Sequence, residues 1–260
     1  MTGVLLNDLV SAMANGRIKV VDLTETLTPD YPTITLPPEF GQASPFVKTE
    51  ISRYDDAGPG WYWNNFTISE HTGTHFDAPI HWVTGKDYKD GAVDTIDPKR
   101  FFAPVCVVNC TAEVKANPDF ILSKDFLIGW EAKHGRIPAG SWVFLRSDWR
   151  NIADPKNYTN LDENGAHSPG PDGEAALWMI NERDVIGFGT ECVGTDAGQA
   201  FLFEPQYPCH HYMHGAGKYG LQCMTNLDLL PPTGAVIVAA PLKIENGSGS
   251  PLRVLALVPA

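Results

Sequence analysis

Residues 71–81, HTGTHFDAPIH, combine three histidines and one aspartate in eleven residues. The polar side chains His71, His75, Asp77 and His81 all occupy odd positions. Because successive side chains of a β-strand point to opposite faces, an extended segment would place these four on one face. Imidazole and carboxylate groups are ligands that borderline divalent metals accept. The segment therefore predicts a metal-binding strand in a metal-dependent enzyme.

A helix is the alternative conformation for two histidines four residues apart. A helical His-x-x-x-His pair binds zinc in proteases that carry a glutamate directly after the first histidine. Here Thr72 takes that place. Gly73 and Pro79 would both weaken a helix interior. The segment is therefore predicted to be a strand, or a strand leading into a loop, with regular pairing ending at Pro79.

Each histidine alone is weak support for a metal site, because a single histidine is commonly a surface or hydrogen-bonded residue. From His75 onward these polar groups alternate with the apolar residues Phe76, Ala78, Ile80 and Trp82, which indicates burial. Burying them without partners would cost about 1–3 kcal/mol for each neutral group and more for the carboxylate. A bound metal removes that cost, and the group as a whole favours a metal site.

The whole-chain composition narrows the possible functions. With 260 residues, 43% of them hydrophobic, the chain can bury one sizeable core, and residues 1–260 are predicted to form a single domain. The net charge of −12 argues against a nucleic-acid partner, and the sequence lacks an apolar run long enough for a membrane span. Residues 5–15 predict an amphipathic helix without the basic region of a secretory signal, so a cytoplasmic location is expected.

Periodicity predicts more strands than helices, and hence a mixed α/β fold with a barrel-like β core and a few flanking helices. Helices are predicted over residues 5–15, 123–134 and 172–182, with Ser123 as an N-cap and Gly135 as a stop. Strands are predicted over residues 19–23, 46–51, 61–68, 103–109, 141–146, 185–189, 235–239 and 253–258.

A second group of histidines lies in residues 209–214, CHHYMH. Prolines and glycines flank this segment, which predicts a loop. His210 or Gln222 could complete the metal sphere, and their spacing does not choose between them. His211 and His214 are expected to be solvated. Glu191, Asp196 and Glu204 have no spacing that distinguishes them.

The aromatic residues Trp61, Trp63 and Phe66 precede the first histidine group. Two interpretations stay open for them. They could fill the core from one strand, or they could form a flat apolar wall that holds a planar ring.

The segment from His71 to His81 resembles the H-x-G-T-H-x-D-x-P-x-H signature of the cyclase-like metal-dependent amidohydrolases. That family includes isatin hydrolases and bacterial kynurenine formamidases. Further similarities lie in residues 143–149, 187–196, 210–228 and 239–253. The resemblance implies a swivelling β/β/α fold and a homodimer or larger homo-oligomer.

The resemblance also implies roles for individual residues. His71, His75 and Asp77 match the metal ligands, and His81 and His210 match the remaining active-site histidines. Gln222 stands where the formamidase branch has a glutamate that serves a second zinc ion. A neutral amide favours one metal held by His71, His75, Asp77 and Gln222, with Mn²⁺ preferred and Zn²⁺ possible. With Gln222 at this position, the sequence resembles the isatin hydrolase branch more than the formamidase branch. The adjacent Cys223 matches a position that could line a proton path.

These assignments predict hydrolysis of a small aromatic cyclic amide, isatin to isatinate, by metal-activated water. Asp77 would bind metal and orient the water, while His81 and His210 would move protons. Trp61, Trp63 and Phe66 would hold the planar substrate, either over their own site or across a dimer interface. Two alternatives stay open: hydrolysis of N-formylkynurenine, and a metal- or ligand-binding module without turnover.

Overall fold

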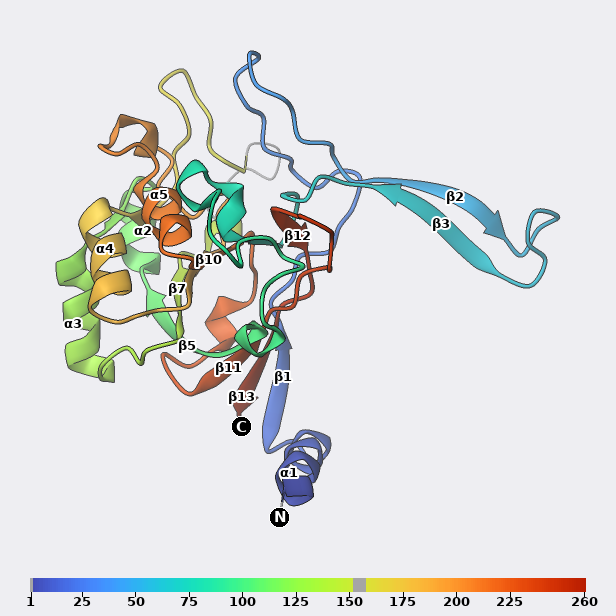
Figure 1. The fold of residues 1–260 in the computed structure, drawn as a ribbon, viewed down its shortest axis with the longest axis horizontal. Coiled ribbons are helices and arrows are strands. Elements are labelled where there is room, and N and C mark those ends of the chain that lie inside the picture. The colour runs from blue at the N-terminus through green and yellow to red at the C-terminus, as the bar shows by residue number, and fades with distance from the viewer. Residues whose placement is uncertain (1, 152–157) are drawn as a thin grey trace.

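A nine-stranded mixed sheet forms the centre of the computed structural model, which describes residues 2–151 and 158–260 (Figure 1). Across the sheet, the strands are β1 (Ile18–Asp22), β13 (Leu255–Pro259), β11 (Ala235–Val238), β5 (Phe102–Asn109), β7 (Trp142–Arg146), β9 (Gly187–Thr190), β10 (Tyr219–Gln222), β4 (His75–Asp77) and β12 (Gly249–Pro251). Strands β5, β7, β9 and β10 run parallel, and antiparallel strands continue the sheet on both sides. This curled sheet with few helices confirms the predicted fold class.

The central strands are apolar on both faces because both faces are covered, as in other parallel sheets. On β5, Ala103 and Val105 belong to one core, while Cys106 and Val108 belong to the core on the opposite face. The second core lies beneath the helices α2 (Thr111–Ala116), α3 (Lys124–His134), α4 (Gly173–Asn181) and α5 (Pro208–Gly215). A short parallel pair, β6 (Ile121–Leu122) and β8 (Gly170–Pro171), lies among the same segments.

All eight predicted strands overlap an observed strand, and the three predicted helices are present. The caps of α3 are those expected. The Ser123 hydroxyl accepts a hydrogen bond from the Phe126 amide at 3.2 Å, and Gly135 ends the helix with a φ of 91°. The hydroxyl satisfies one of the amide groups that every helix start leaves unpaired.

The predicted loop at residues 209–214 is wrong, because these residues lie in helix α5. Pro208 occupies the first turn, where proline's missing N–H costs nothing and its fixed φ suits a helix. Gly215 ends the same helix. The flanking proline and glycine that indicated a loop are therefore the two ends of a short helix.

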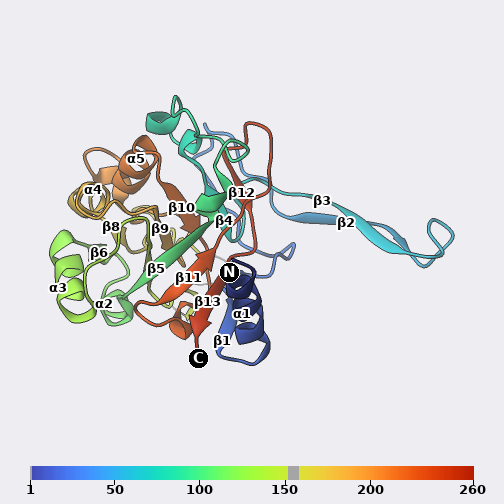
Figure 2. The ribbon, with the colours of Figure 1, turned by 60° about the horizontal axis from the view of Figure 1, so that its bottom comes forward.

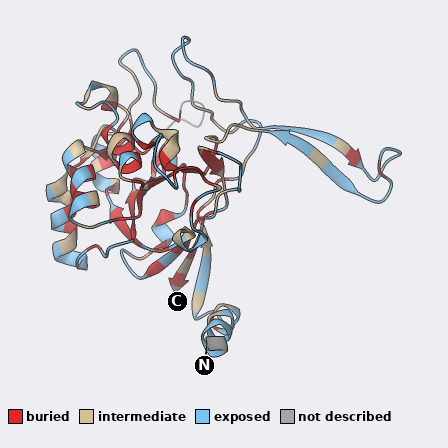
Figure 3. Cartoon of the chain, in the orientation of Figure 1, coloured by how far each residue is buried: buried red, intermediate tan, exposed pale blue. Residues whose placement is uncertain are grey.

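Strands β2 (Val47–Arg53) and β3 (Tyr62–Thr67) form a separate antiparallel hairpin, here called the arm, that leads away from the main body (Figures 1 and 2). Most of the arm is exposed (Figure 3). The exposed fractions of Trp61, Trp63 and Phe66 are 52%, 54% and 64%. The interpretation of these aromatic residues as core is therefore wrong.

Helix α1 (Thr2–Ala14) precedes β1 and also stands apart from the core (Figure 1). Its apolar residues Leu5, Leu6 and Val10 are exposed, and Ala12 is buried. In the described part of the chain, none of the helices combines the length and the hydropathy needed to cross a bilayer.

Candidate metal and catalytic site

The three-residue strand β4 lies between β10 and β12, and Asp77 is paired with a glycine on each side. A Cβ atom on Gly220 would lie 2.7 Å from Oδ2 of Asp77. A Cβ atom on Gly249 would lie 2.6 Å from Cε1 of His71. Both distances are too short for real atoms, so the absence of two side chains provides the space in which Asp77 and His71 meet.

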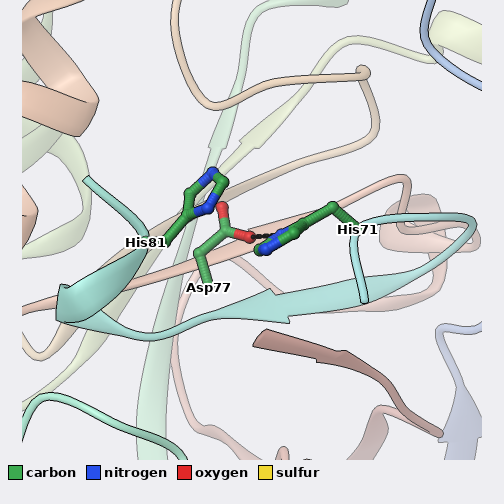
Figure 4. A group of neighbouring side chains, drawn as sticks. All are labelled: His71, Asp77 and His81. Atoms are coloured by element: carbon green, nitrogen blue, oxygen red, sulfur yellow. Dashed lines mark hydrogen bonds and ion pairs between the residues drawn. The ribbon is translucent and has the colours of Figure 1, made fainter. Parts of the chain in front are cut away.

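Several polar side chains converge on the fully buried carboxylate of Asp77. Nδ1 of His71 lies 2.8 Å from Oδ1 and donates a hydrogen bond to it, as Figure 4 shows. Nε2 of His75 lies 3.4 Å from the same oxygen. On the other side, Nε2 of His210 lies 3.8 Å from Oδ2, and the Gln222 amide donates a hydrogen bond to that oxygen.

The predicted convergence of residues 71–81 is therefore observed, although most of the segment is not a strand. Gly73 has a φ of 70°, which turns the chain before β4, and Pro79–His81 forms a 3₁₀ helix after it. These two turns bring the ends of the segment together. The rings of His71 and His81 stack with their centroids 3.8 Å apart.

The protonation states suit a cation. Burial lowers the pKa of His81 to about 2 and that of His214 to about 4, and it also lowers the pKa of His75. Burial alone would raise the pKa of Asp77, but the surrounding histidines outweigh it and the pKa lies well below its usual value. At neutral pH the site therefore offers the neutral imidazoles of His75, His81 and His214 beside one ionised carboxylate.

This donor set fits a divalent metal. Two groups have donor atoms within 4.8 Å of one another: His71 with Asp77 and His81, and Asp77 with His210 and His214. Nε2 of His214 is buried and has no hydrogen-bond partner. An imidazole with a free buried nitrogen beside an ionised carboxylate is a typical metal environment.

The other ring nitrogens of two histidines are held by the backbone. Nδ1 of His75 donates to the Gly73 carbonyl at 2.7 Å, and Nδ1 of His214 donates to the Lys218 carbonyl at 3.2 Å. Each bond fixes the tautomer that leaves Nε2 with its lone pair, as is usual for metal-binding histidines.

The expectation that His214 is solvated is wrong, since only 1% of this residue is exposed. His210 and His214 are four residues apart on α5 and therefore share one face of the helix. His211 lies outside that pair and is partly buried. Predicting a helix here would have revealed the pair.

Asp196 is a site residue that sequence reasoning missed. Its Oδ2 lies 2.5 Å from Nδ1 of His210, and its Oδ1 accepts a hydrogen bond from the Cys209 amide at 2.7 Å. Burial disfavours the charged form of His210, but the hydrogen bond to Asp196 outweighs this effect and raises the pKa of His210.

Gln222 lies beside Asp77, and both ends of its amide are engaged. Its nitrogen donates to Asp77, and its oxygen accepts a hydrogen bond from the Gly194 amide at 2.7 Å. The oxygen, which is the atom that binds metals, thus faces Gly194. The next residue, Cys223, is buried, and burial raises the pKa of its thiol to about 12.

Trp82 is the aromatic side chain beside the histidines, and sequence reasoning did not identify it. Its ring centroid lies 4.9 Å from that of His210 and 5.7 Å from that of Tyr207. The predicted substrate-binding residues Trp61, Trp63 and Phe66 lie instead on or beside strand β3 of the arm, where they are exposed.

Comparisons with known proteins show which proteins this chain resembles. A family model described as "Putative cyclase" matches residues 21–197. The isatin hydrolase of Roseibium aggregatum is 48% identical over 256 residues, covering 98% of this chain and 97% of its own. A kynurenine formamidase of Salinibacter ruber is 28% identical and covers 72% of this chain and 76% of its own.

Solved structures extend the similarity to the whole fold. Isatin hydrolase A from Labrenzia aggregata, bound to benzyl benzoate, has a TM-score of 0.96 and 56% identity, with 98% of this chain and 99% of that chain covered. An isatin hydrolase bound to the product analogue thioisatinate has a TM-score of 0.97 and 46% identity, with both chains covered completely.

Proposed function

This chain belongs to the putative cyclase family, and from that premise we propose that it is a metal-dependent amidohydrolase that opens the lactam ring of isatin to give isatinate. The observation that carries the proposal is the near-complete coverage at 48% identity by an isatin hydrolase, together with the carboxylate of Asp77 among histidines. Hydrolysis of N-formylkynurenine, an open-chain amide, is the second candidate, because formamidases match at lower identity.

A single divalent metal, preferably Mn²⁺ and alternatively Zn²⁺, would be held by His71, His75, Asp77 and Gln222. Gln222 would have to turn its amide, so that the oxygen now facing Gly194 is presented to the cation. Bound there, the metal would polarise the amide carbonyl and lower the pKa of a water molecule towards neutrality. Asp77, ionised and central, both balances the charge and accepts a hydrogen bond from the water.

The histidines supply the proton transfers. Opening the lactam forms a bond from the water oxygen to the carbonyl carbon and breaks the bond from that carbon to nitrogen. One proton of the water must reach the leaving nitrogen, and the other is released as the new carboxylic acid ionises. His210, whose pKa is raised, can take up a proton at Nε2 and deliver it to the leaving nitrogen, and the neutral ring of His81 lies beside it with centroids 5.7 Å apart. Cys223, next to Gln222, would line a path for the released proton, and its buried thiol stays protonated because burial raises its pKa to about 12.

Parallel assays of isatin and N-formylkynurenine test this function. We expect isatin to be hydrolysed with the higher kcat/KM, and elemental analysis of the purified protein to give one metal ion per chain. Preference for formylkynurenine would select the second candidate. Failure with both substrates in metal-loaded protein would favour a binding module without turnover.

The Gln222→Glu variant tests the single-metal proposal. A carboxylate here would add a negative charge beside Asp77, so we expect a second metal ion to bind or the metal preference to move towards Zn²⁺. Elemental analysis of both proteins, loaded in the same mixture of Mn²⁺ and Zn²⁺, measures this change. Two zinc ions already present in the wild type would contradict the proposal.

The arm supports a homodimer as the assembly. An isolated two-stranded hairpin is only marginally stable in water, yet this one exposes Trp61, Trp63 and Phe66. We propose that the arm packs on a second copy of the chain and that these aromatic side chains bind the planar substrate in the partner's site. The arm also carries Arg53 and Tyr62, with the guanidinium carbon of Arg53 4.4 Å from the Tyr62 ring centre.

Replacing Trp63 with alanine should raise KM for isatin about tenfold, because a stacking surface worth about 1.4 kcal/mol is lost. The change in kcat should be smaller. Steady-state kinetics measure KM and kcat, and light scattering after size exclusion measures the mass of the assembly. Ile128→Ala, on the exposed face of α3, is the control and should change neither KM nor mass. An unchanged KM in the Trp63 variant would remove this residue from the substrate site.

A further inference from the structure

Asp196 is a buried carboxylate that accepts three hydrogen bonds. It accepts from the backbone amide of Cys209 at 2.7 Å and from the backbone amide of His210 at 3.1 Å. It also accepts from Nδ1 of the His210 ring at 2.5 Å. All of these donors belong to the first turn of α5.

The two backbone bonds fix where the carboxylate lies. The N-cap residue of α5, Tyr207, has a left-handed backbone and offers no side-chain cap. The first amide groups of a helix have no partner within the helix, and they favour a negative charge. Asp196 supplies that partner from a distant loop, so its position is set by the helix backbone and not by the ring.

The third bond then fixes the ring of His210. With Nδ1 protonated and directed at Asp196, neutral His210 must carry its lone pair on Nε2. That atom lies 3.8 Å from Oδ2 of Asp77. Trp82 packs against the same ring, with centroids 4.9 Å apart, which limits its rotation.

We propose that Asp196 is the positioning residue of the site: it holds His210 in the tautomer and orientation that direct Nε2 at the reacting groups around Asp77. The expected kinetic effect rests on the proposed function, whereas the expected tautomer of His210 rests on the geometry alone. Asp196 itself does not touch the substrate. It acts through His210, as a carboxylate does when it orients a catalytic imidazole.

The Asp196→Asn variant tests the proposal with little change of shape. The amide oxygen can still accept from Cys209, while the NH₂ group now faces the donors of His210. The ring is then expected to protonate on Nε2 or to turn. We expect kcat to fall about 10²–10⁴-fold, the usual range for a lost proton-transfer group. KM and bound metal should stay within about twofold.

A double-mutant cycle separates positioning from a general structural effect. In a His210→Ala background, Asp196→Asn should lower kcat by no more than about twofold, because its route of action is already gone. Asp172→Asn is the matched control: Asp172 caps α4 by accepting from the Ala175 amide at 2.7 Å, with no histidine attached. It should leave kcat unchanged. An equal loss in both backgrounds would overturn the proposal.

Nitrogen NMR of ¹⁵N-histidine-labelled protein gives a readout that does not depend on the substrate. The wild type should show His210 protonated at Nδ1, assigned by its disappearance in His210→Ala, and Asp196→Asn should lose this signature. An unchanged tautomer in Asp196→Asn would overturn the proposal even if activity fell. If isatin proves not to be the substrate, the tautomer change is still expected, so the two proposals fail separately.

Discussion

Asp77→Ala should remove the bound metal and lower kcat/KM for isatin by about 10³-fold or more, a larger loss than for a single electrostatic contact. Asp77 is the carboxylate on which His71, His75 and His210 converge. Without it, these histidines lose the carboxylate that would balance the charge of a dication among them. His75→Ala should also lose metal, although some affinity can remain because other imidazoles lie nearby.

Elemental analysis and steady-state kinetics of the Asp77→Ala protein measure this prediction, and circular dichroism checks that the fold survives. Asp77→Asn keeps the shape of the side chain and should also lose most activity. Asp87→Ala is the control, since the Asp87 side chain is 88% exposed and pairs loosely with Lys86 at 4.0 Å. Stoichiometric metal in Asp77→Ala would show that the ion binds elsewhere.

Gly220→Ala is expected to lower kcat/KM about 100-fold by adding a single methyl group. That methyl would lie 2.7 Å from Oδ2 of Asp77, so the carboxylate or strand β10 must shift. A displacement of about 1 Å at a catalytic group commonly costs about 10²-fold in rate. Overpacking a buried strand should also lower the free energy of unfolding by about 1–3 kcal/mol.

Kinetics, metal analysis and denaturant unfolding of the Gly220→Ala protein separate these effects. Gly129→Ala provides the matched control, because a Cβ atom there meets nothing within 4 Å and Gly129 lies inside α3. That variant should keep full activity and gain about 0.5–1 kcal/mol of stability. Wild-type kcat/KM in Gly220→Ala would mean that Asp77 has more room than the structure gives it.

The sequence was most informative where function depends on neighbouring residues. Residues 71–81 revealed their role because His71, Asp77 and His81 converge through two local turns. Periodicity likewise located the strands and the capped helix α3, since burial and capping leave local patterns.

The other half of the site depends on contacts between distant segments. His214 was misjudged because the proline and glycine at the ends of α5 were interpreted as loop signals. Asp196 carries no local signal, since its role arises only when its loop meets the first turn of α5. The orientation of the Gln222 amide depends on Gly194, twenty-eight residues away in the chain.

The pair of glycines beside Asp77 affects how this site can be mapped by experiment. At most positions alanine scanning removes atoms, and in this way it would find His71 and Asp77. At Gly220 and Gly249 the same substitution adds a methyl group, so a loss of activity there reports filled space and not a lost contact. Their contribution is empty volume between three adjacent strands. A mutational map of this enzyme is complete only if it also adds atoms, one methyl group at a time.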